Sequence, residues 1–372
     1  MSDESPIAPG GAIDPSRFES DDGPAEVSLR LQRDLNKRLD RYLCDRIPWL
    51  SRTSLQRLIR EDAVTVNGRP PKPSTRLRLG DEVRVVLPPP PEKTLPAEEI
   101  PLEILYEDDD LLVLNKQDDI IVHPARGNQS GTIINGLAWH FRQQGAGQLS
   151  EVGAEQARPG VVHRLDRHTT GVMVVAKTET AHWRIGKQFQ DRTTRKRYIA
   201  LVHGNVEPVA DVIDLPLGLH PTIRHRCAVR WDDTGKESTT LYRVIEQYGD
   251  FTLVEVELRT GRTHQIRVHL SHLGWPLAGD DLYGGRHVEV RDVLPADWSA
   301  GDRRHVLLGR QGLHATLLGF AHPITHEEVT FTAPLPEDLA SMIYLLRQRG
   351  PVDCPDVPGR VIDLESVLPA GS

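Results

Sequence analysis

Four consecutive prolines, residues 88–91, divide this 372-residue chain. Proline lacks the backbone N–H that a sheet ladder requires, and a run of prolines favours the extended polyproline II conformation, which acts as a semi-rigid spacer. Because no sheet is expected to continue through such a run, we interpret residues 89–96 as a linker between two domains. A chain of this length is large enough to form more than one hydrophobic core.

Residues 29–87 carry an excess of positive charge: fourteen Lys and Arg residues against seven Asp and Glu residues, a net charge of +7. Leucine and isoleucine recur there at helical spacing, Ser51 or Thr53 is a candidate cap for a second helix, and a strand over 64–66 ends in an Asn-Gly turn before a closing strand over 81–87. We predict a small basic α/β domain over 27–88 that binds RNA phosphates. The alternative is a solvated charged face. The candidate RNA contacts are Arg38, Arg41, Arg52, Arg57 and Arg60.

The two ends of the chain are acidic. Residues 1–26 hold seven acids and one base, and residues 352–372 hold four acids and one base. Acidic segments that contain proline and glycine are typical of disordered tails, so we predict such tails over 1–26 and 349–372. The net charge of −8 comes from these ends, and it does not argue against nucleic-acid binding by the segments between them.

Several classes of protein do not fit this sequence. It has no apolar run of about 18 residues that would span a membrane, and no basic patch followed by an apolar stretch that would indicate a secretory signal. Its three cysteines are far apart, which suggests no disulfide framework and fits a reduced cytoplasm. It also lacks a phosphate-binding glycine loop, an H-E-x-x-H pair and a G-x-S-x-G turn, so we expect no cofactor and no metal.

An acidic residue within a cluster of bases is the best candidate for chemistry. Asp166 lies in the segment H-R-L-D-R-H-T-T-G, residues 163–171, which leads into an apolar run. Nearby cations favour an ionised carboxylate, which is either half of a structural ion pair or a nucleophile or base. Taken by itself, the segment favours the ion pair. A second segment, T-G-R-T-H-Q-I-R-V-H-L at 260–270, favours a functional site, because so many polar groups are costly to bury unpaired.

The pattern after residue 97 mixes strands and helices. Apolar runs predict strands over 111–116, 172–176, 198–202 and 251–258, and helical spacing predicts helices that start near 131 and extend over 181–190 and 265–273. Because the strands do not alternate regularly with helices, we predict an α+β fold with a mixed sheet in place of a doubly wound parallel one. Residues 286–310 are interpreted as an insertion or a long loop.

Five ordered segments carry a family resemblance. The segments at 163–171 and 260–270 resemble the H-R-L-D-x-x-T-S/T-G and G-R-T-H-Q-I-R-V-H signatures of pseudouridine synthases of the RluA/RluD type. K-R-Y-I-A-L-V at 196–202, G-D-D-L-Y-G at 279–284 and L-H-A at 313–315 are similar to further motifs of that family. The resemblance implies a catalytic domain over 97–348 with a largely antiparallel sheet and flanking helices. The basic block at 27–88 resembles the αL RNA-binding domain shared with a small-subunit ribosomal protein.

The resemblance also implies residue roles in the isomerisation of uridine. Asp166 would be the nucleophile or base, Arg262 its charge partner, and Tyr198 the ring that stacks on the target base. Arg164 would fill the space left by a flipped base or pair with a phosphate, and Lys196 would contact a phosphate or remain a solvated charge. The alternatives are a buried salt bridge for Asp166 with Arg262, and a core position for Tyr198.

RNA is therefore the expected partner, with large-subunit ribosomal RNA favoured over transfer RNA, and we expect a monomer in the cytoplasm. Three other functions compete: a transfer-RNA pseudouridine synthase, a non-catalytic RNA-binding protein that assists ribosome assembly, and a metal-dependent nuclease or hydrolase. The presence of Asp166, Tyr198 and Arg262 together argues against the non-catalytic protein.

Overall fold

The computed structural model describes residues 25–47, 52–87, 96–123, 130–144, 160–223, 225–294, 303–350 and 352–369. The chain divides into two compact units, Met1–Thr94 and Leu95–Ser372, and the division falls inside the linker predicted at 89–96. Residues 1–24 of the predicted N-terminal tail and 89–95 of the linker lie outside the described residues. The tail prediction is wrong at its end, because strand β1 begins at Ala25.

The first unit packs two helices on a small sheet. Strand β1 (Ala25–Arg30) is followed by α1 (Leu39–Arg46), α2 (Arg52–Arg60), β2 (Val64–Val66) and β3 (Glu82–Leu87). The antiparallel order is β1-β3-β2. Asn67 and Gly68 both have positive φ after β2, as an Asn-Gly turn requires. The helices and strands expected from the sequence therefore occur, around a core of leucine, isoleucine and valine.

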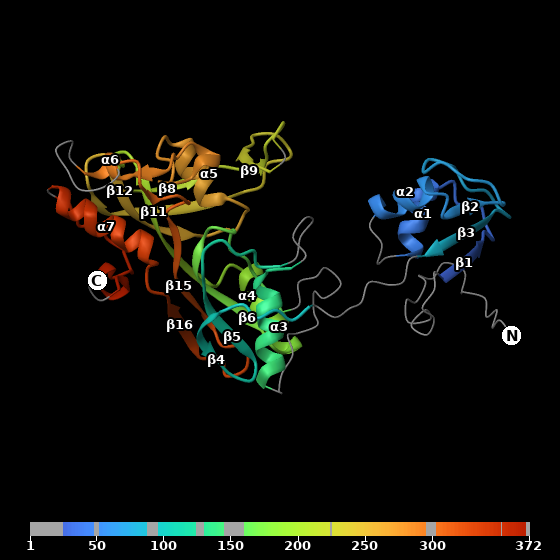
Figure 1. The fold of residues 1–372 in the computed structure, drawn as a ribbon, viewed down its shortest axis with the longest axis horizontal. Helices are drawn as coiled ribbons and strands as arrows, with labels where there is room; N and C mark the ends of the chain where they lie inside the picture. Colours follow the sequence, from blue (N-terminus) through green and yellow to red (C-terminus); the bar gives the residue numbers. More distant parts are fainter. Residues whose placement is uncertain are drawn as a thin grey trace. The chain divides into compact units, whose positions relative to one another are not determined.

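The second unit is built on one nine-stranded sheet (Figure 1). Its strand order is β4-β5-β6-β15-β7-β12-β11-β8, with β16 added on β15, and of these pairings only β6 with β15 is parallel in the described part of the chain. The mixed, largely antiparallel sheet is thus confirmed. The strands are β4 (Glu103–Glu107), β5 (Leu111–Lys116), β6 (Thr170–Ala176), β7 (Arg195–His203), β8 (Ala210–Asp214), β11 (Thr239–Gln247), β12 (Phe251–Leu258), β15 (Leu313–Ala321) and β16 (Glu328–Thr332).

Helices cover both faces of this sheet. At the β5–β6 end, α3 (Ile133–Gln144) packs on one face and α4 (Glu179–Gln190) on the other. At the β7–β12 end, α5 (Gln265–His272) and α7 (Glu337–Arg349) lie on opposite faces. A hairpin of β9 (Leu217–Leu219) and β10 (Cys227–Val229) packs beside α5. Among the described residues, no helix is both long and apolar enough to cross a membrane.

The predicted C-terminal tail, 349–372, is wrong over most of its length. Arg349 ends α7, and residues 352–369 run along the sheet and form the short helix α8 (Leu364–Val367). Leu364, Val367 and Leu368 are buried in the same core as α7. The acidic composition of the segment led to the prediction of disorder. Its apolar residues are few and widely spaced, but they bury enough surface to order the segment.

Residues 286–310 are likewise more ordered than a loop. They form β13 (Val288–Glu289), α6 (Val290–Val293) and β14 (Val306–Leu308), and 295–302 lie outside the described residues. Val288, Val293 and Leu308 are buried in the core under α7. The elements are too short for periodicity to indicate them; the pairing of β13 with β14 and the packing against α7 define them.

Gly171 explains the glycine of the first motif. Its φ is +114°, and a Cβ there would lie 2.2 Å from the carbonyl oxygen of Ala315, on the neighbouring parallel strand β15. No other residue has both the backbone freedom and the small size for this position. The glycine therefore allows the close pairing of β6 with β15 that brings their residues side by side.

We expect Gly171→Ala to lower the free energy of unfolding of the second unit by at least about 3 kcal/mol, because strain and overlap add. The matched control is Gly274→Ala, where φ is +91° but nothing lies within 4 Å of the new Cβ. That variant should lose only roughly 1–2 kcal/mol. Urea denaturation followed by tryptophan fluorescence measures both. Equal losses would show that the overlap with Ala315 is relaxed without cost.

Candidate active site

A cavity of about 530 Å³ opens between the loop before β6, the end of α4, β7 and the loop before α5. Its volume lies within the roughly 300–1,000 Å³ typical of ligand pockets. Among the described residues that line it, six are Lys or Arg and one is a carboxylate, that of Asp166. The cations are Arg164, Arg192, Lys196, Arg259, Arg262 and Arg267. A polyanion is the ligand that such a lining attracts.

Asp166 lies in the loop that leads into β6, with its side chain 19% exposed. Arg267 Nη1 is 3.3 Å from Asp166 Oδ2, and His264 Nε2 is 3.8 Å from the same oxygen. Burial lowers the pKa of His264, against the opposing effect of the Asp166 charge. The guanidinium of Arg267 is therefore the cation that pairs most closely with the Asp166 carboxylate.

Arg267 is itself held in place by residues on the side away from Asp166. It lies in the first turn of α5, and its guanidinium donates from Nε and Nη2 to the two oxygens of the fully buried Asp280, at 2.7 and 2.8 Å. The ring of Tyr283 lies 4.9 Å from the guanidinium carbon. Burial would lower the pKa of Arg267, but the hydrogen bonds and charges of Asp280 and Asp166 raise it. The G-D-D-L-Y-G motif thus supplies the support for Arg267.

The sequence analysis expected an ion pair between Arg262 and Asp166, and the structure corrects this expectation. Arg262 is exposed at the rim of the same cavity, and its Nε donates to the carbonyl oxygen of Glu237 at 3.2 Å. The backbone N–H of Arg262 donates to Gln265 Oε1, which holds the loop just before α5 begins. The partner of Asp166 is Arg267, five residues downstream in the same motif. Both residues carry the same charge, so the sequence did not show which of them pairs with Asp166. The start of α5 decides it, because Arg262 lies in the loop before the helix and Arg267 lies in its first turn.

Tyr198 lines the cavity from the centre of the sheet. It is half-buried on β7, between Val256 of β12 and Ala315 of β15. Burial and, secondarily, the charge of Asp166 raise the pKa of its hydroxyl above the ordinary value. The structure therefore brings Tyr198 and Asp166 to one cavity, with the phenol protonated at neutral pH.

Lys196 and Arg164 also line the cavity. Arg164 is exposed, whereas Lys196 is half-buried with its Nζ 5.8 Å from the centre of the Phe189 ring. Phe189 in turn stacks on His163 at 4.5 Å. Burial lowers the pKa of Lys196 to about 8. Lys196 is thus a cation inside the cavity wall, not the solvated charge that was the alternative.

The remaining motif histidines support the fold. His269 is fully buried, 2.9 Å from the Thr240 hydroxyl, and its Nε2 donates to the Leu215 carbonyl oxygen at 3.0 Å. His314, of the L-H-A motif, lies 2.8 Å from the hydroxyl of Thr170, which explains why a hydroxyl residue is needed there. In the described ranges, no three His, Cys, Asp or Glu side chains are placed to hold a metal ion.

Comparisons with known proteins identify the family of this chain. A family model described as "RNA pseudouridylate synthase" matches residues 110–272, and an S4 domain model matches 37–83. The "Uncharacterized RNA pseudouridine synthase YlyB" of Bacillus subtilis is 40% identical over 315 residues, which cover 85% of this chain and 96% of that protein. The chain belongs to the RNA pseudouridine synthase family. It is an enzyme that isomerises uridine to pseudouridine.

Other relatives of this pseudouridine synthase carry more specific names. The "Ribosomal large subunit pseudouridine synthase D" of Haemophilus influenzae is 38% identical over 316 residues, which cover 84% of this chain and 92% of that protein. Among solved structures, "Human RNA Pseudouridylate Synthase Domain Containing 1" has a TM-score of 0.46 and 26% identity, and covers 68% of this chain and 98% of that one.

In the S4 domain, the candidate RNA contacts fall into two groups. Arg38 and Arg52 both donate to Asp40, a carboxylate with no exposed surface that also accepts from Gln56. Burial would raise the pKa of Asp40, but these hydrogen bonds lower it overall. Arg38 and Arg52 therefore have a structural role, although both remain about half exposed. The other three candidates, Arg41, Arg57 and Arg60, are exposed on the helices, and their side chains do not contact Asp40.

One residue of the synthase domain escaped the sequence analysis. Lys116, at the end of β5, has no exposed surface, and its Nζ donates to the carbonyl oxygens of Gln117 and Arg167 at 2.9 and 2.8 Å. Burial lowers its pKa to about 7, against the opposing charges of Asp118 and Asp166. In the sequence, the only sign of a special role for Lys116 was that a charged residue ends an otherwise apolar strand.

We expect Arg267→Lys to lower kcat/KM by about a hundredfold, because an ammonium does not hold Asp280 in a fork and reach Asp166 at the same time. Arg262→Lys, in the same motif and cavity, should stay within about threefold, since its guanidinium contacts a surface carbonyl. Steady-state kinetics on an RNA substrate measures both. A larger loss for Arg262→Lys would restore Arg262 as the partner of Asp166.

Proposed function

We propose that this pseudouridine synthase modifies large-subunit ribosomal RNA and that Asp166 carries the isomerisation as nucleophile or base. The observation that supports Asp166 most is its position: among the described residues it supplies the one carboxylate of a cavity lined by six cationic side chains. The ribosomal target is supported by relatives from Haemophilus influenzae and Vibrio parahaemolyticus that are named "Ribosomal large subunit pseudouridine synthase D".

The chemistry requires one well-placed carboxylate. Uridine isomerisation breaks the bond between N1 and the sugar C1′, turns the base, and forms a bond between C5 and C1′. A proton leaves C5 and N1 gains one, so atoms and electrons balance without an oxidant or a nucleotide cofactor. The carboxylate must be ionised and held in a fixed direction at the glycosidic bond or the base. The ion pair of Asp166 with the buried Arg267 supports this role.

The other cavity residues suit the recognition of a flipped nucleotide. The ring of Tyr198 offers a surface on which a base stacks, and stacking on an aromatic ring contributes roughly 1–3 kcal/mol per base. Arg164 and Arg262 at the rim and Lys196 in the cavity wall are proposed to contact phosphates or, for Arg164, to fill the place of the flipped base. We propose that the enzyme acts as a monomer in the cytoplasm.

Mapping of pseudouridines in total RNA tests the target and the role of Asp166 together. Cells without the gene should lose specific pseudouridines in large-subunit ribosomal RNA. A plasmid copy of the wild-type gene should restore these sites, and Asp166→Asn should not, because it removes the charge while retaining the shape. Losses confined to transfer RNA would contradict the ribosomal target. Restoration by Asp166→Asn, at equal protein levels, would contradict the catalytic role.

We expect the combined variant Arg41→Gln, Arg57→Gln and Arg60→Gln to weaken binding to long structured RNA. Each arginine that no longer neutralises a phosphate should reduce the slope of log affinity against log salt by roughly 0.7–0.9. Filter binding at several salt concentrations measures the slope, and thermal unfolding should match the wild type because these side chains are exposed. Activity on a short RNA at high concentration should persist. An unchanged slope would show that these arginines form only a solvated face.

A further inference from the structure

We propose that Arg310, held by Asp338 of α7, is a positioning residue for the loop that carries Asp166. The proposal rests on the role of Asp166 in the proposed function. Arg310 lies just before β15, at the end of the segment that was expected to be a loop, and it makes no part of the cavity lining. Its side chain is only 6% exposed. A buried guanidinium at this place requires several acceptors.

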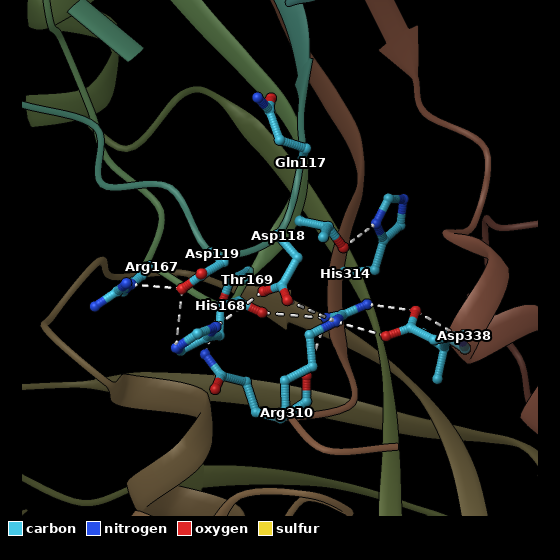
Figure 2. A network of polar contacts seen from close by, with 12 residues as sticks. Gln117, Asp118, Asp119, Arg167, His168, Thr169, Arg310, His314 and Asp338 are labelled. Atoms are coloured by element: carbon cyan, nitrogen blue, oxygen red, sulfur yellow. Dashed lines mark hydrogen bonds and ion pairs between the residues drawn. The ribbon is translucent and has the colours of Figure 1, made fainter. Parts of the chain in front are cut away.

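The acceptors of Arg310 connect α7 to the Asp166 loop (Figure 2). Nε and Nη2 each donate to an oxygen of Asp338 at 2.7 Å. On its other side, Nη1 donates to the carbonyl oxygen of His168 at 3.1 Å and to that of Gln311 at 3.3 Å, and Asp118 Oδ2 lies 3.8 Å from Nε. The fork thus joins a helix to a peptide group two residues after Asp166.

The loop is held at Asp166 and at each of the three residues that follow it. The backbone N–H of Thr169 donates to the carbonyl oxygen of Asp166 at 3.1 Å, which makes a tight turn. Lys116 binds the carbonyl of Arg167, Arg310 binds that of His168, and the Gln311 amide donates to the Thr169 hydroxyl at 3.3 Å. Because buried donors hold this turn, the side chain of Asp166 has few alternative orientations.

The exposed ion pairs on the outer side of the loop restrict its position less than the buried hydrogen bonds do. Figure 2 shows Arg167 and His168 directed toward Asp119 and Asp118. Arg167 Nε is 2.7 Å from Asp119 Oδ1, and His168 Nδ1 is 3.0 Å from Asp118 Oδ1. All four side chains are more than 40% exposed, and ion pairs at such exposure contribute little. The buried contact of Arg310 is therefore the stronger constraint on this part of the loop.

The backbone of Arg310 also packs against Gly279, next to the residue that holds Arg267. Gly279 has a φ of +79°, and a Cβ there would lie 1.9 Å from the carbonyl oxygen of Arg310. The next residue, Asp280, is the one that holds Arg267. The side chain of Arg310 thus supports the loop of Asp166, while its backbone packs against the segment that supports Arg267. A shift of Arg310 changes the distance between carboxylate and guanidinium, and a displacement of about 1 Å near reacting groups costs roughly a hundredfold in rate.

A second ion pair between an arginine and a carboxylate, also involving α7, provides a matched control. Arg347 donates to the two oxygens of Glu246, on β11, at 2.9 and 2.6 Å, and to Glu365 at 2.8 Å. Like the pair of Arg310 with Asp338, it attaches α7 to the rest of the unit through a partly buried fork. Its partners are on β11 and α8, not in the loop of residues 166–169. Removal of this pair therefore loosens α7 without releasing the carbonyl of His168.

The experiment compares Arg310→Lys and Asp338→Asn with Arg347→Lys and Glu246→Gln in the full-length enzyme. The substrate is a transcript of large-subunit ribosomal RNA labelled with tritium at C5 of uridine, because isomerisation releases that hydrogen to water. We expect Arg310→Lys to lower kcat by about tenfold to a hundredfold, with KM within about threefold of wild type. Asp338→Asn, which retains one acceptor oxygen, should show a smaller loss of the same kind. The controls should keep kcat within about twofold of wild type at a similar loss of melting temperature.

Equal losses of kcat in the two pairs, at equal losses of melting temperature, would overturn the proposal, because Arg310 would then only attach α7. A wild-type kcat in both Arg310→Lys and Asp338→Asn would also overturn it. Asp166→Asn in the same assay separates this failure from failure of the proposed function. Tritium release by Asp166→Asn contradicts the role of Asp166, whereas an inactive Asp166→Asn beside unaffected Arg310 variants contradicts only the positioning role.

Discussion

The site depends on one buried guanidinium placed between two carboxylates. Arg267 binds the inaccessible Asp280 through a fork and offers its remaining nitrogen to Asp166. The removal of such charges from water costs about as much as their attraction returns, so this arrangement adds little to stability. What it provides is direction, because a planar guanidinium fixed on one side presents its last donor along one line. The orientation of the Asp166 carboxylate follows from that geometry, and the ring of Tyr283 and the first turn of α5 maintain it.

A comparison of Asp166 with Asp40 shows why a carboxylate among bases is not sufficient for catalysis. Both acids have arginine partners, but Asp40 has no exposed surface and accepts from Arg38, Arg52 and Gln56. Its oxygens are fully used, so it is a structural residue. Asp166 is 19% exposed and opens on the cavity, where an oxygen remains accessible to a ligand. The difference between a structural ion pair and a reactive group is therefore accessibility, which depends on the surrounding fold.

Acidic and basic residues are distributed unevenly between the parts of the chain. The chain as a whole is acidic, with a net charge of −8, yet the cavity and the S4 domain are rich in arginine and lysine. Such local fields attract a polyanion regardless of the total, because screening limits the influence of distant acids to about 10 Å. Within the cavity one of these cations, Arg267, also forms the ion pair with Asp166. The same side chains that suit RNA therefore suit the chemistry.

The sequence by itself determined the features that depend on near neighbours. Apolar periodicity indicated β5, β6, β7, β12, α4 and α5, the Asn-Gly turn followed β2 as expected, and the ordered motifs identified Asp166 and Tyr198 as residues of one site. Tertiary structure decided what depends on distant partners. It selected Arg267 over Arg262, because only a residue inside the first turn of α5 points at both Asp280 and Asp166. It ordered residues 352–369, whose few apolar side chains gain burial only against α7 and the sheet. It also placed Arg310 beneath the Asp166 loop, 142 residues from His168 along the chain, where no local pattern records a hydrogen bond to a backbone carbonyl.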